Sequence, residues 1–256
     1  MRGKRTSLSD QIDHDSTEDT LLGGQVRLRQ PKEGFRAAID TVLLAAAVPA
    51  KSGQNVLELG VGSGGATLCL LHRVDGVNIT GIDVNPTMVT LATNNVRLNS
   101  VSDRAEISIG DVAKKLPTEF DATFDHVMMN PPYLPEKTDH VSSNPDRALA
   151  TKEAGANLKR WLKFGHDALR YKGYLTVIHR ADRLDELIKS LSHNFGGVTI
   201  QPLWPREGEE AKRIIVQTRK GVGTPARILP GVTIHRDDGG YTDEAAAILK
   251  GAPLRL

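Results

Sequence analysis

Cysteine is almost absent from this chain of 256 residues, which contains only Cys69. A single cysteine excludes a disulfide within the chain and agrees with a reducing, cytoplasmic environment. Cys69 lies in the apolar run ATLCLLHRV. Burial in such a run raises the pKa of a thiol and makes it unreactive, so we expect a core residue and not a catalytic nucleophile.

Long hydrophobic runs are missing as well. No stretch reaches the roughly 18 apolar residues that a membrane-spanning helix needs, so no membrane partner is expected. The first twenty or so residues are basic and then acidic, without the apolar core of a signal peptide. The eight histidines show no spacing typical of a metal site, so the sequence predicts no metal.

Charge of either sign is not in large excess. The net charge of +2 and the isoelectric point near 8.6 are too weak to indicate nucleic acid by themselves. The composition, 39% hydrophobic and 25% charged, is typical of a globular domain with one sizeable core. We expect residues 1–24 to form a flexible tail and residues 25–256 to form a single domain, which begins with an extension over residues 25–52.

Apolar runs of strand length alternate with helical stretches after the first fifty residues. The expected strands are NVLELG, VNITGIDV, RAEISIGD, FDHVMMN and GYLTVIH, with helical stretches such as GATLCLLHRV and PTMVTLATNNVRLNS between them. This alternation predicts an α/β fold with a mostly parallel, Rossmann-like sheet and helices on both faces. The late run AKRIIVQTRKG is expected to close the sheet as an antiparallel edge strand.

A glycine-rich turn joins the first of these strands to a helix, in VLELGVGSGGATLCLL. Gly60, Gly62 and Gly65 fit the dinucleotide-binding spacing G-x-G-x-x-G. Asp83 ends the next expected strand, where a ribose-binding acid belongs. Taken alone, this pattern indicates an NAD-linked oxidoreductase.

Three further features favour a different cofactor. Glu58 stands two residues before the first glycine, so the turn also reads E-x-G-x-G-x-G through Gly64. Asp111 ends the third strand, and Asn130 opens the sequence NPPY at the end of the fourth. In this order on successive strands, the motifs resemble those of the class I S-adenosylmethionine-dependent methyltransferases. The resemblance implies a sheet of seven strands, and the NPPY members of that class methylate amino or amide nitrogens.

The resemblance also implies roles in binding S-adenosylmethionine. Asp83 would accept hydrogen bonds from both ribose hydroxyls, while Asp111 would face the adenine amino group with Val112 against the ring. Glu58 would orient the glycine turn or the methionine amine. For the two aspartates the alternative is helix capping, and for Glu58 it is a purely structural role. The predicted cofactor-binding residues are Glu58, Gly60, Gly62, Gly64, Asp83, Val84, Asp111, Val112 and Asn130.

The NPPY sequence predicts the chemistry. A planar amino group conjugated to a base or carbonyl is a poor nucleophile, because its lone pair is delocalised. The Asn130 side-chain oxygen and a backbone carbonyl within Asn130-Pro131 can accept its hydrogens and turn the nitrogen towards the methyl group. Tyr133 offers a flat face for stacking, and no strong base is required. The predicted catalytic residues are Asn130, Pro131 and Tyr133.

The segment RQPKEGFRAAIDTVLLAAAVP, just ahead of the glycine turn, resembles the bacterial adenine-N6 methyltransferases that act beside the anticodon of a valine tRNA. The basic residue, aspartate and two leucines of that family read here as Arg36, Asp40, Leu43 and Leu44. The resemblance implies that residues 25–52 lie on the substrate side, with Arg36 near the target loop and Asp40 bracing the site. The predicted substrate-binding residues are Arg36, Asp40, Pro132 and Tyr133.

Several alternatives stay open. Release-factor glutamine methyltransferases share NPPY, but they carry a separate helical N-terminal domain, for which about fifty residues leave little room. A non-catalytic module that holds S-adenosylmethionine and binds RNA is the second alternative, and the NAD-linked oxidoreductase is the third. Arg36 and Asp40 are four residues apart and could form an ion pair on one helix.

Two weaker patterns agree with an RNA substrate, which the resemblance implies is a tRNA. Basic residues gather near the start, after NPPY and near the end of the chain, and phosphate contacts require such groups. The polar stretch over residues 135–151 is expected to form a lid or loop on the substrate side. The sequence leaves the oligomeric state unknown.

Overall fold

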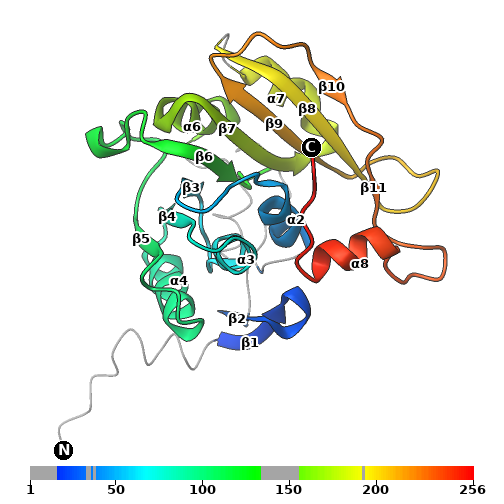
Figure 1. The fold of residues 1–256 in the computed structure, drawn as a ribbon, viewed down its shortest axis with the longest axis horizontal. Helices are drawn as coiled ribbons and strands as arrows, with labels where there is room; N and C mark the ends of the chain where they lie inside the picture. Colours follow the sequence, from blue (N-terminus) through cyan, green and yellow to red (C-terminus); the bar gives the residue numbers. More distant parts are fainter. Residues whose placement is uncertain (1–15, 33–35, 37–38, 134–155, 192–193) are drawn as a thin grey trace, which may run out of the picture.

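The computed structural model describes residues 16–32, 36, 39–133, 156–191 and 194–256, and Figure 1 shows their arrangement. A mixed sheet forms the centre, in the order β10-β8-β9-β7-β6-β3-β4-β5, with β11 beside β8. Seven of its strands are long and two are very short. Their bounds are β3 (Asn55–Leu59), β4 (Asn78–Asp83), β5 (Ala105–Ile109), β6 (Phe124–Met129), β7 (Leu169–Arg180), β8 (Phe195–Trp204), β9 (Arg213–Lys220), β10 (Arg227–Ile228) and β11 (Val232–Thr233).

Strand direction confirms the predicted mostly parallel sheet. The strands β5, β4, β3, β6 and β7 run parallel to one another, whereas β9 runs antiparallel to both β7 and β8. The antiparallel direction of β9 was expected, but its placement at an edge is wrong, because β8 lies outside it. The sequence did not reveal β8, since two glycines and Pro202 interrupt its apolar pattern.

Helices cover both faces of the sheet, as predicted. One face carries α2 (Ile39–Ala47), α3 (Gly65–Arg73), α4 (Pro86–Leu98) and α8 (Asp243–Leu249), and the other carries α6 (Leu158–Ala168) and α7 (Leu184–Ser190). The described residues also form three short 3₁₀ helices, η1 (Leu22–Gly24), η2 (Thr118–Phe120) and η3 (Ala181–Arg183).

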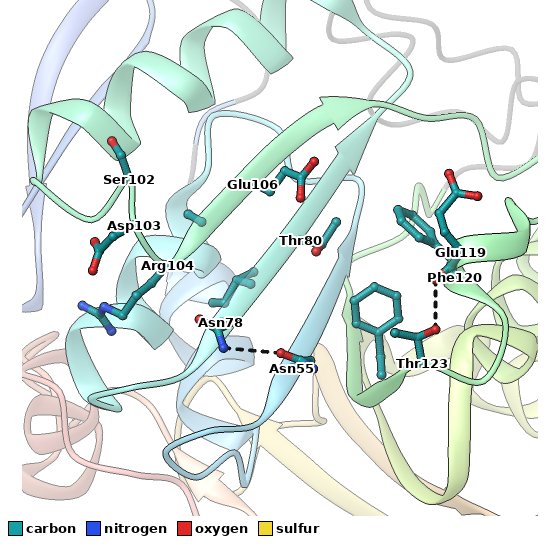
Figure 2. A pocket seen from close by; sticks show the side chains of 13 residues that line it. Asn55, Asn78, Thr80, Ser102, Asp103, Arg104, Glu106, Glu119, Phe120 and Thr123 are labelled. Atoms are coloured by element: carbon teal, nitrogen blue, oxygen red, sulfur yellow. Dashed lines mark hydrogen bonds between the residues drawn. The ribbon is translucent and has the colours of Figure 1, made fainter.

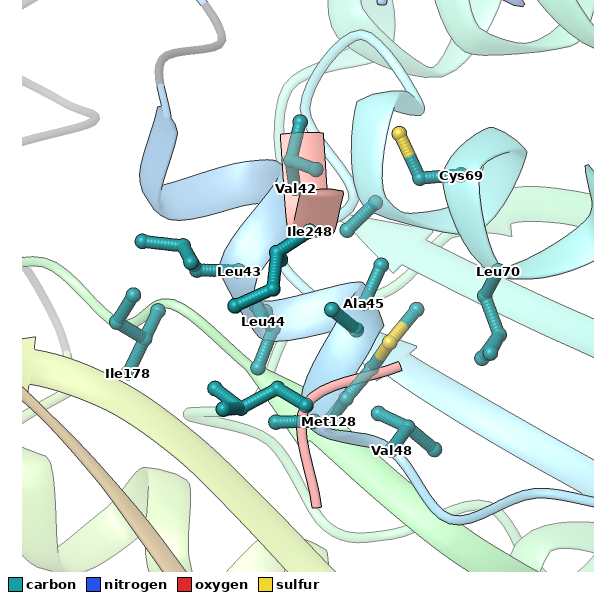
Figure 3. Packing of buried hydrophobic residues seen from close by; sticks show 14 of the residues in the cluster. Val42, Leu43, Leu44, Ala45, Val48, Cys69, Leu70, Met128, Ile178 and Ile248 are labelled. Carbon is teal, nitrogen blue, oxygen red and sulfur yellow. The ribbon is translucent and has the colours of Figure 1, made fainter. Parts of the chain in front are cut away.

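Two hydrophobic cores follow from this layering. In β6, Met128 points into the core beneath α2 and α3, whereas Val127 and Met129 point into the core beneath α6. This alternation explains why every residue of β6 is buried, including the polar Asp125 and His126, and why its second half is continuously apolar. Figure 3 shows Leu43 and Leu44 of α2 facing Met128 and Ile178 of the sheet. The cores fix the ends of the strands, which carry the predicted site.

The core also contains Cys69, as expected. Its side chain is 2% exposed, and burial raises the pKa of the thiol to about 12. Cys69 therefore stays a protonated, unreactive core residue. In the described part of the chain, no helix combines the length and the apolar character needed to cross a membrane.

A two-stranded hairpin precedes the domain core. Strand β1 (Ser16–Leu21) pairs antiparallel with β2 (Val26–Pro31). The expectation of a flexible tail up to residue 24 is therefore wrong for residues 16–24, while residues 1–15 lie outside the described residues. The polar sequence STEDTL has no apolar alternation that would predict a strand, and the strand forms through its pairing with β2.

Asn95 of α4 and Asn99, the residue directly after α4, attach this hairpin to the domain. The Asn95 side chain accepts a hydrogen bond from the Arg29 N–H at 2.9 Å and donates to the Arg29 carbonyl at 2.8 Å. Asn99, one helical turn later, does the same with Arg27 at 3.0 Å and 2.7 Å. Asn95 also donates to the carbonyl of Ser63, in the glycine turn, at 2.8 Å. The hairpin and the glycine turn thus share one fully buried amide.

Candidate functional site

The predicted motifs meet at one edge of the sheet. Because β3, β4, β5 and β6 are parallel, their carboxyl ends lie side by side, and each carries one motif at or just after its last residues. Leu59 pairs with Met129, so Gly60 and Asn130 both follow directly after paired residues. Asp83 pairs with Ile109, which places it close to the turn that contains Asp111.

The glycine turn needs its glycines for backbone conformation. Gly60, Gly62 and Gly64 have φ angles of +72°, +53° and +87°, a region that other residues seldom adopt. A Cβ added to Gly62 would meet nothing within 4 Å, so this side of the turn is open. A Cβ on Gly60 would lie 2.9 Å from Cη2 of Trp161, whose indole therefore packs directly against the turn. The open side at Gly62 is where a ligand can approach the backbone.

Asp83 ties the turn to the next strand. Its Oδ2 accepts the Gly62 N–H at 2.9 Å, and its Oδ1 accepts the Asn85 N–H at 2.9 Å. Burial raises the pKa of Asp83, and backbone hydrogen bonds from Asn85, Gly62 and Val84 oppose the rise. A carboxylate has about four lone-pair sites, so Asp83 keeps capacity to accept a further hydrogen bond, such as one from a ribose hydroxyl. The side chain that caps α4 is Asn85, so the capping alternative does not hold for Asp83.

Glu58 lies behind the turn in a buried position. Glu58 is 4% exposed, and its carboxylate accepts a hydrogen bond from the Thr67 hydroxyl at 2.5 Å. Burial raises the pKa of Glu58 to about 8, and the nearby Asp83 charge adds to the rise. The contact joins the end of β3 to the first turn of α3. In this structure Glu58 connects β3 to α3, the two elements that flank the glycine turn, and its role towards the turn or the cofactor stays a prediction.

The remaining predicted cofactor residues surround the end of β5. The Asp111 Oδ1 accepts the Ala113 N–H at 2.8 Å, which makes a side-chain turn with no helix directly after it in the described residues. Helix capping therefore does not explain Asp111 either. Val112 is 7% exposed and belongs to the core beneath α6, whereas Val84 is 50% exposed. Exposed apolar surface at this edge suits a planar ring.

The NPPY turn leaves β6 next to the glycine turn. Pro131 is buried, while Asn130, Pro132 and Tyr133 are partly exposed. Two guanidinium groups lie over the Tyr133 ring, that of Arg213 at 5.8 Å and that of Arg180 at 6.0 Å from its centre. A third arginine, Arg183, donates to the Tyr133 carbonyl at 3.0 Å.

The sequence did not identify these three arginines as site residues. They come from β7, η3 and β9, far from NPPY along the chain. Arg213 stood out only as one of several basic residues near the end. No local pattern could have singled them out, because the contacts arise only when the strands assemble.

Arg36 and Asp40 do not pair with each other. Arg36 pairs with Asp19 of the hairpin and donates to the Thr17 hydroxyl and the Pro31 carbonyl, both at 2.8 Å. Asp40 instead accepts from Nε of Arg213 at 2.8 Å. The ion-pair alternative is therefore wrong. Asp40 is connected to Tyr133 through Arg213, whereas the contacts of Arg36 are with residues of the hairpin.

A separate pocket of about 570 Å³ lies at the opposite edge of the sheet. Figure 2 shows its polar lining, with Asn55, Asn78 and Arg104 at the amino ends of β3, β4 and β5. The Asn78 amide donates to the Asn55 side-chain oxygen at 3.4 Å across its floor. None of the predicted site residues lines this pocket. The stretch over residues 135–151, expected to form a lid, lies outside the described residues.

Comparison with known families supports a methyltransferase site at this edge of the sheet. The model of the methyltransferase small domain family matches residues 36–201, which is well over half of the chain. The chain belongs to this family and is an S-adenosylmethionine-dependent methyltransferase. The NAD-linked alternative is thereby excluded.

Curated relatives cover most of the chain. A tRNA1(Val) (adenine(37)-N6)-methyltransferase of Actinobacillus pleuropneumoniae is 27% identical over 75% of this chain and 80% of its own length. A protein of the same name from a Shewanella strain is 24% identical over 87% of this chain and 94% of its own length. These identities are modest, but the match extends well beyond the glycine turn.

Solved structures confirm the fold. A predicted O-methyltransferase from Agrobacterium tumefaciens superposes with a TM-score of 0.71 at 24% identity, covering 85% of this chain and 99% of that one. A tRNA (m1A58) methyltransferase from Aquifex aeolicus gives a TM-score of 0.53 at 15% identity, covering 76% and 73%. At these identities the likeness concerns the arrangement of the sheet and helices alone.

The residues present fit S-adenosylmethionine, the cofactor of this class. The open side of Gly62 leaves room for the methionine portion, and the remaining acceptor capacity of Asp83 suits a ribose hydroxyl. The individual binding and catalytic residues stay predictions.

Proposed function

We propose that this protein methylates the exocyclic N6 amino group of an adenine in tRNA, next to the anticodon of a valine tRNA. The observation that carries the proposal is the placement of Asn130 beside Gly60, at the ends of two paired strands. The names of the curated relatives support the same substrate. A tRNA substrate implies that the protein works in the cytoplasm.

The NPPY turn accounts for recognition of a planar amine. The Asn130 side-chain oxygen and its backbone carbonyl accept the two N6 hydrogens, so the nitrogen lone pair is directed out of conjugation with the ring. Pro131 is buried and lacks an N–H group, and its ring limits the movement of that carbonyl. Tyr133 stacks on the base, a contact worth roughly 1–3 kcal/mol.

The chain needs little acid–base chemistry for this reaction. When bound, S-adenosylmethionine supplies an electrophilic methyl group on a sulfonium. As the nitrogen gains the methyl group, its N–H protons become acidic, so Asn130 can hold the departing proton until water takes it. The glycine turn and NPPY align nitrogen, methyl and sulfur, which lowers the entropic part of the barrier. An adenine in an anticodon loop is unpaired, so it reaches Asn130 at little cost.

The test is methyl transfer from labelled S-adenosylmethionine to tRNA that lacks its natural modifications, followed by nucleoside analysis. We expect N6-methyladenosine in valine tRNA. Transfer to a release-factor glutamine and not to RNA would replace the proposal with the protein-methylating alternative. Tight S-adenosylmethionine binding without turnover on any RNA would indicate a non-catalytic module.

Asn130→Ala tests the mechanism. The rate should fall at least about 100-fold, as loss of a hydrogen bond that strengthens in the transition state typically does. S-adenosylmethionine should still bind, because the glycine turn and Asp83 are unchanged. Asn78→Ala, at the opposite edge of the sheet, is the matched control and should keep the full rate. Near-normal turnover of Asn130→Ala would contradict the assigned role.

A further inference from the structure

Two arginines lie over the ring on which the target base is proposed to stack. The guanidinium carbons of Arg213 and Arg180 are 5.8 Å and 6.0 Å from the centre of the Tyr133 ring. Both side chains remain about one-third exposed, at 35% for Arg213 and 36% for Arg180. They are therefore accessible from solvent on the substrate side of NPPY.

Each of these arginines is oriented by one carboxylate. Nε of Arg213 donates to Asp40 at 2.8 Å, and its Nη1 donates to the Lys212 carbonyl at 3.1 Å. Arg180 is held by Asp182, through Nε at 2.9 Å and through Nη2. A guanidinium has five N–H donors, and two are used in each case. Three donors on each arginine therefore lack an acceptor within the described part of the chain.

This arrangement is typical of directed anion recognition. The carboxylates balance the charge of the two arginines, so the site offers oriented N–H donors more than a broad positive potential. Such donors match the oxygen atoms of a phosphate, which a guanidinium can bind through two parallel hydrogen bonds. A glutamine side chain offers one neutral carbonyl oxygen, which cannot form the paired, charge-assisted hydrogen bonds that a phosphate forms with a guanidinium.

We propose that Arg180 and Arg213 form a clamp for the phosphates on either side of the target adenosine. This inference rests on the proposed function and adds the contact that holds the nucleotide while its base stacks on Tyr133. Asp40 is a positioning residue, since it acts through Arg213. Orienting Arg213 is then the function of Asp40, which the sequence predicted to lie on the substrate side.

The experiment uses an anticodon stem-loop RNA in which one phosphate beside the target adenosine is replaced by an uncharged methylphosphonate. For the unaltered protein, this replacement should raise KM for RNA about tenfold, as loss of a charge-assisted hydrogen bond does. In the double variant Arg180→Ala/Arg213→Ala, KM for natural RNA should rise by at least that factor. The methylphosphonate should then cause almost no further change, while the affinity for S-adenosylmethionine stays within about twofold.

Arg219 provides the matched control on the same strand. It lies at the other end of β9 from Arg213 and also packs on a tyrosine, with 4.6 Å between its guanidinium and the Tyr174 ring. Arg219→Ala should retain the full sensitivity to methylphosphonate. Because removing Arg213 leaves Asp40 unpaired, a variant with Arg213→Ala and Asp40→Asn together guards against a folding defect.

Three outcomes separate the two proposals. Equal methylphosphonate sensitivity in the parent and in the folded double variant would overturn the clamp and leave the proposed function intact. Loss of that sensitivity in the arginine variants alone would establish the clamp. If the parent makes no N6-methyladenosine in the natural stem-loop or in whole tRNA, the proposed function is refuted, and the clamp, which rests on it, is refuted as well.

Discussion

The contact between Gly60 and Trp161 leads to a quantitative prediction for Gly60→Ala. A residue other than glycine at φ +72° costs about 1–2 kcal/mol in backbone strain. The new Cβ would also lie 2.9 Å from Cη2 and 3.2 Å from Cζ3 of the indole. Trp161 is 9% exposed and packed in the core beneath α6, so it cannot move aside freely. Overpacking of this kind costs about 1–3 kcal/mol more.

Gly62→Ala separates the two contributions. Its φ of +53° carries the same kind of backbone strain, but its added Cβ would meet nothing within 4 Å. We therefore expect Gly62→Ala to lower the free energy of unfolding by about 1–2 kcal/mol and Gly60→Ala by about 2–5 kcal/mol. Urea unfolding without cofactor, followed by circular dichroism, measures both values.

Repeating both glycine substitutions in a Trp161→Leu variant identifies the clashing atoms. The indole atoms near Gly60 belong to the far end of the Trp161 side chain, which leucine does not reach. In Trp161→Leu, the excess loss caused by Gly60→Ala over Gly62→Ala should shrink to near zero. Equal losses for both glycine variants in the parent chain would refute the reasoning, as would an unchanged excess in the leucine background.

Two further predictions concern the carboxylates of the site. The pKa of Glu58 is raised to about 8 from an ordinary 4.5, so its contribution to stability is complete below pH 4.5 and is lost as the pH rises through 8. At about 1.36 kcal/mol per pH unit this is roughly 5 kcal/mol. In cofactor-free unfolding between pH 4 and pH 9, Glu58→Gln should lack this decline, and an unchanged decline would point to another group. Asp83→Ala should weaken S-adenosylmethionine binding at least about tenfold by calorimetry; unchanged affinity would remove Asp83 from the cofactor site.

Local patterns predicted the motifs and their common edge. Parallel strands bring their carboxyl ends together, so the positions of Gly60, Asp83, Asp111 and Asn130 followed from the order of strands alone. A helix over residues 39–47 could also be predicted, because the apolar residues Ile39, Val42, Leu43, Ala46 and Ala47 repeat at three and four; in the structure residues 42–47 are all buried.

Long-range partners could not be predicted in the same way. Asp40 seemed suited to Arg36, four residues away, yet it pairs with Arg213, 173 residues later. Their spacing permits an ion pair between Arg36 and Asp40, but in the structure Arg36 pairs with Asp19 of the hairpin. Strand β8 was missed for a related reason, since its neighbour β9 and not its own composition makes it a strand.

The attachment of the hairpin through Asn95 and Asn99 has a consequence for sequence variation. Both amides bind main-chain atoms of β2, which are the same whatever side chains stand at positions 27 and 29. The outward side chains of the hairpin can therefore change freely while its position relative to Ser63 stays fixed. The surface beside the glycine turn can thus carry side chains of different charge and size without any change in the hydrogen bonds that attach the hairpin.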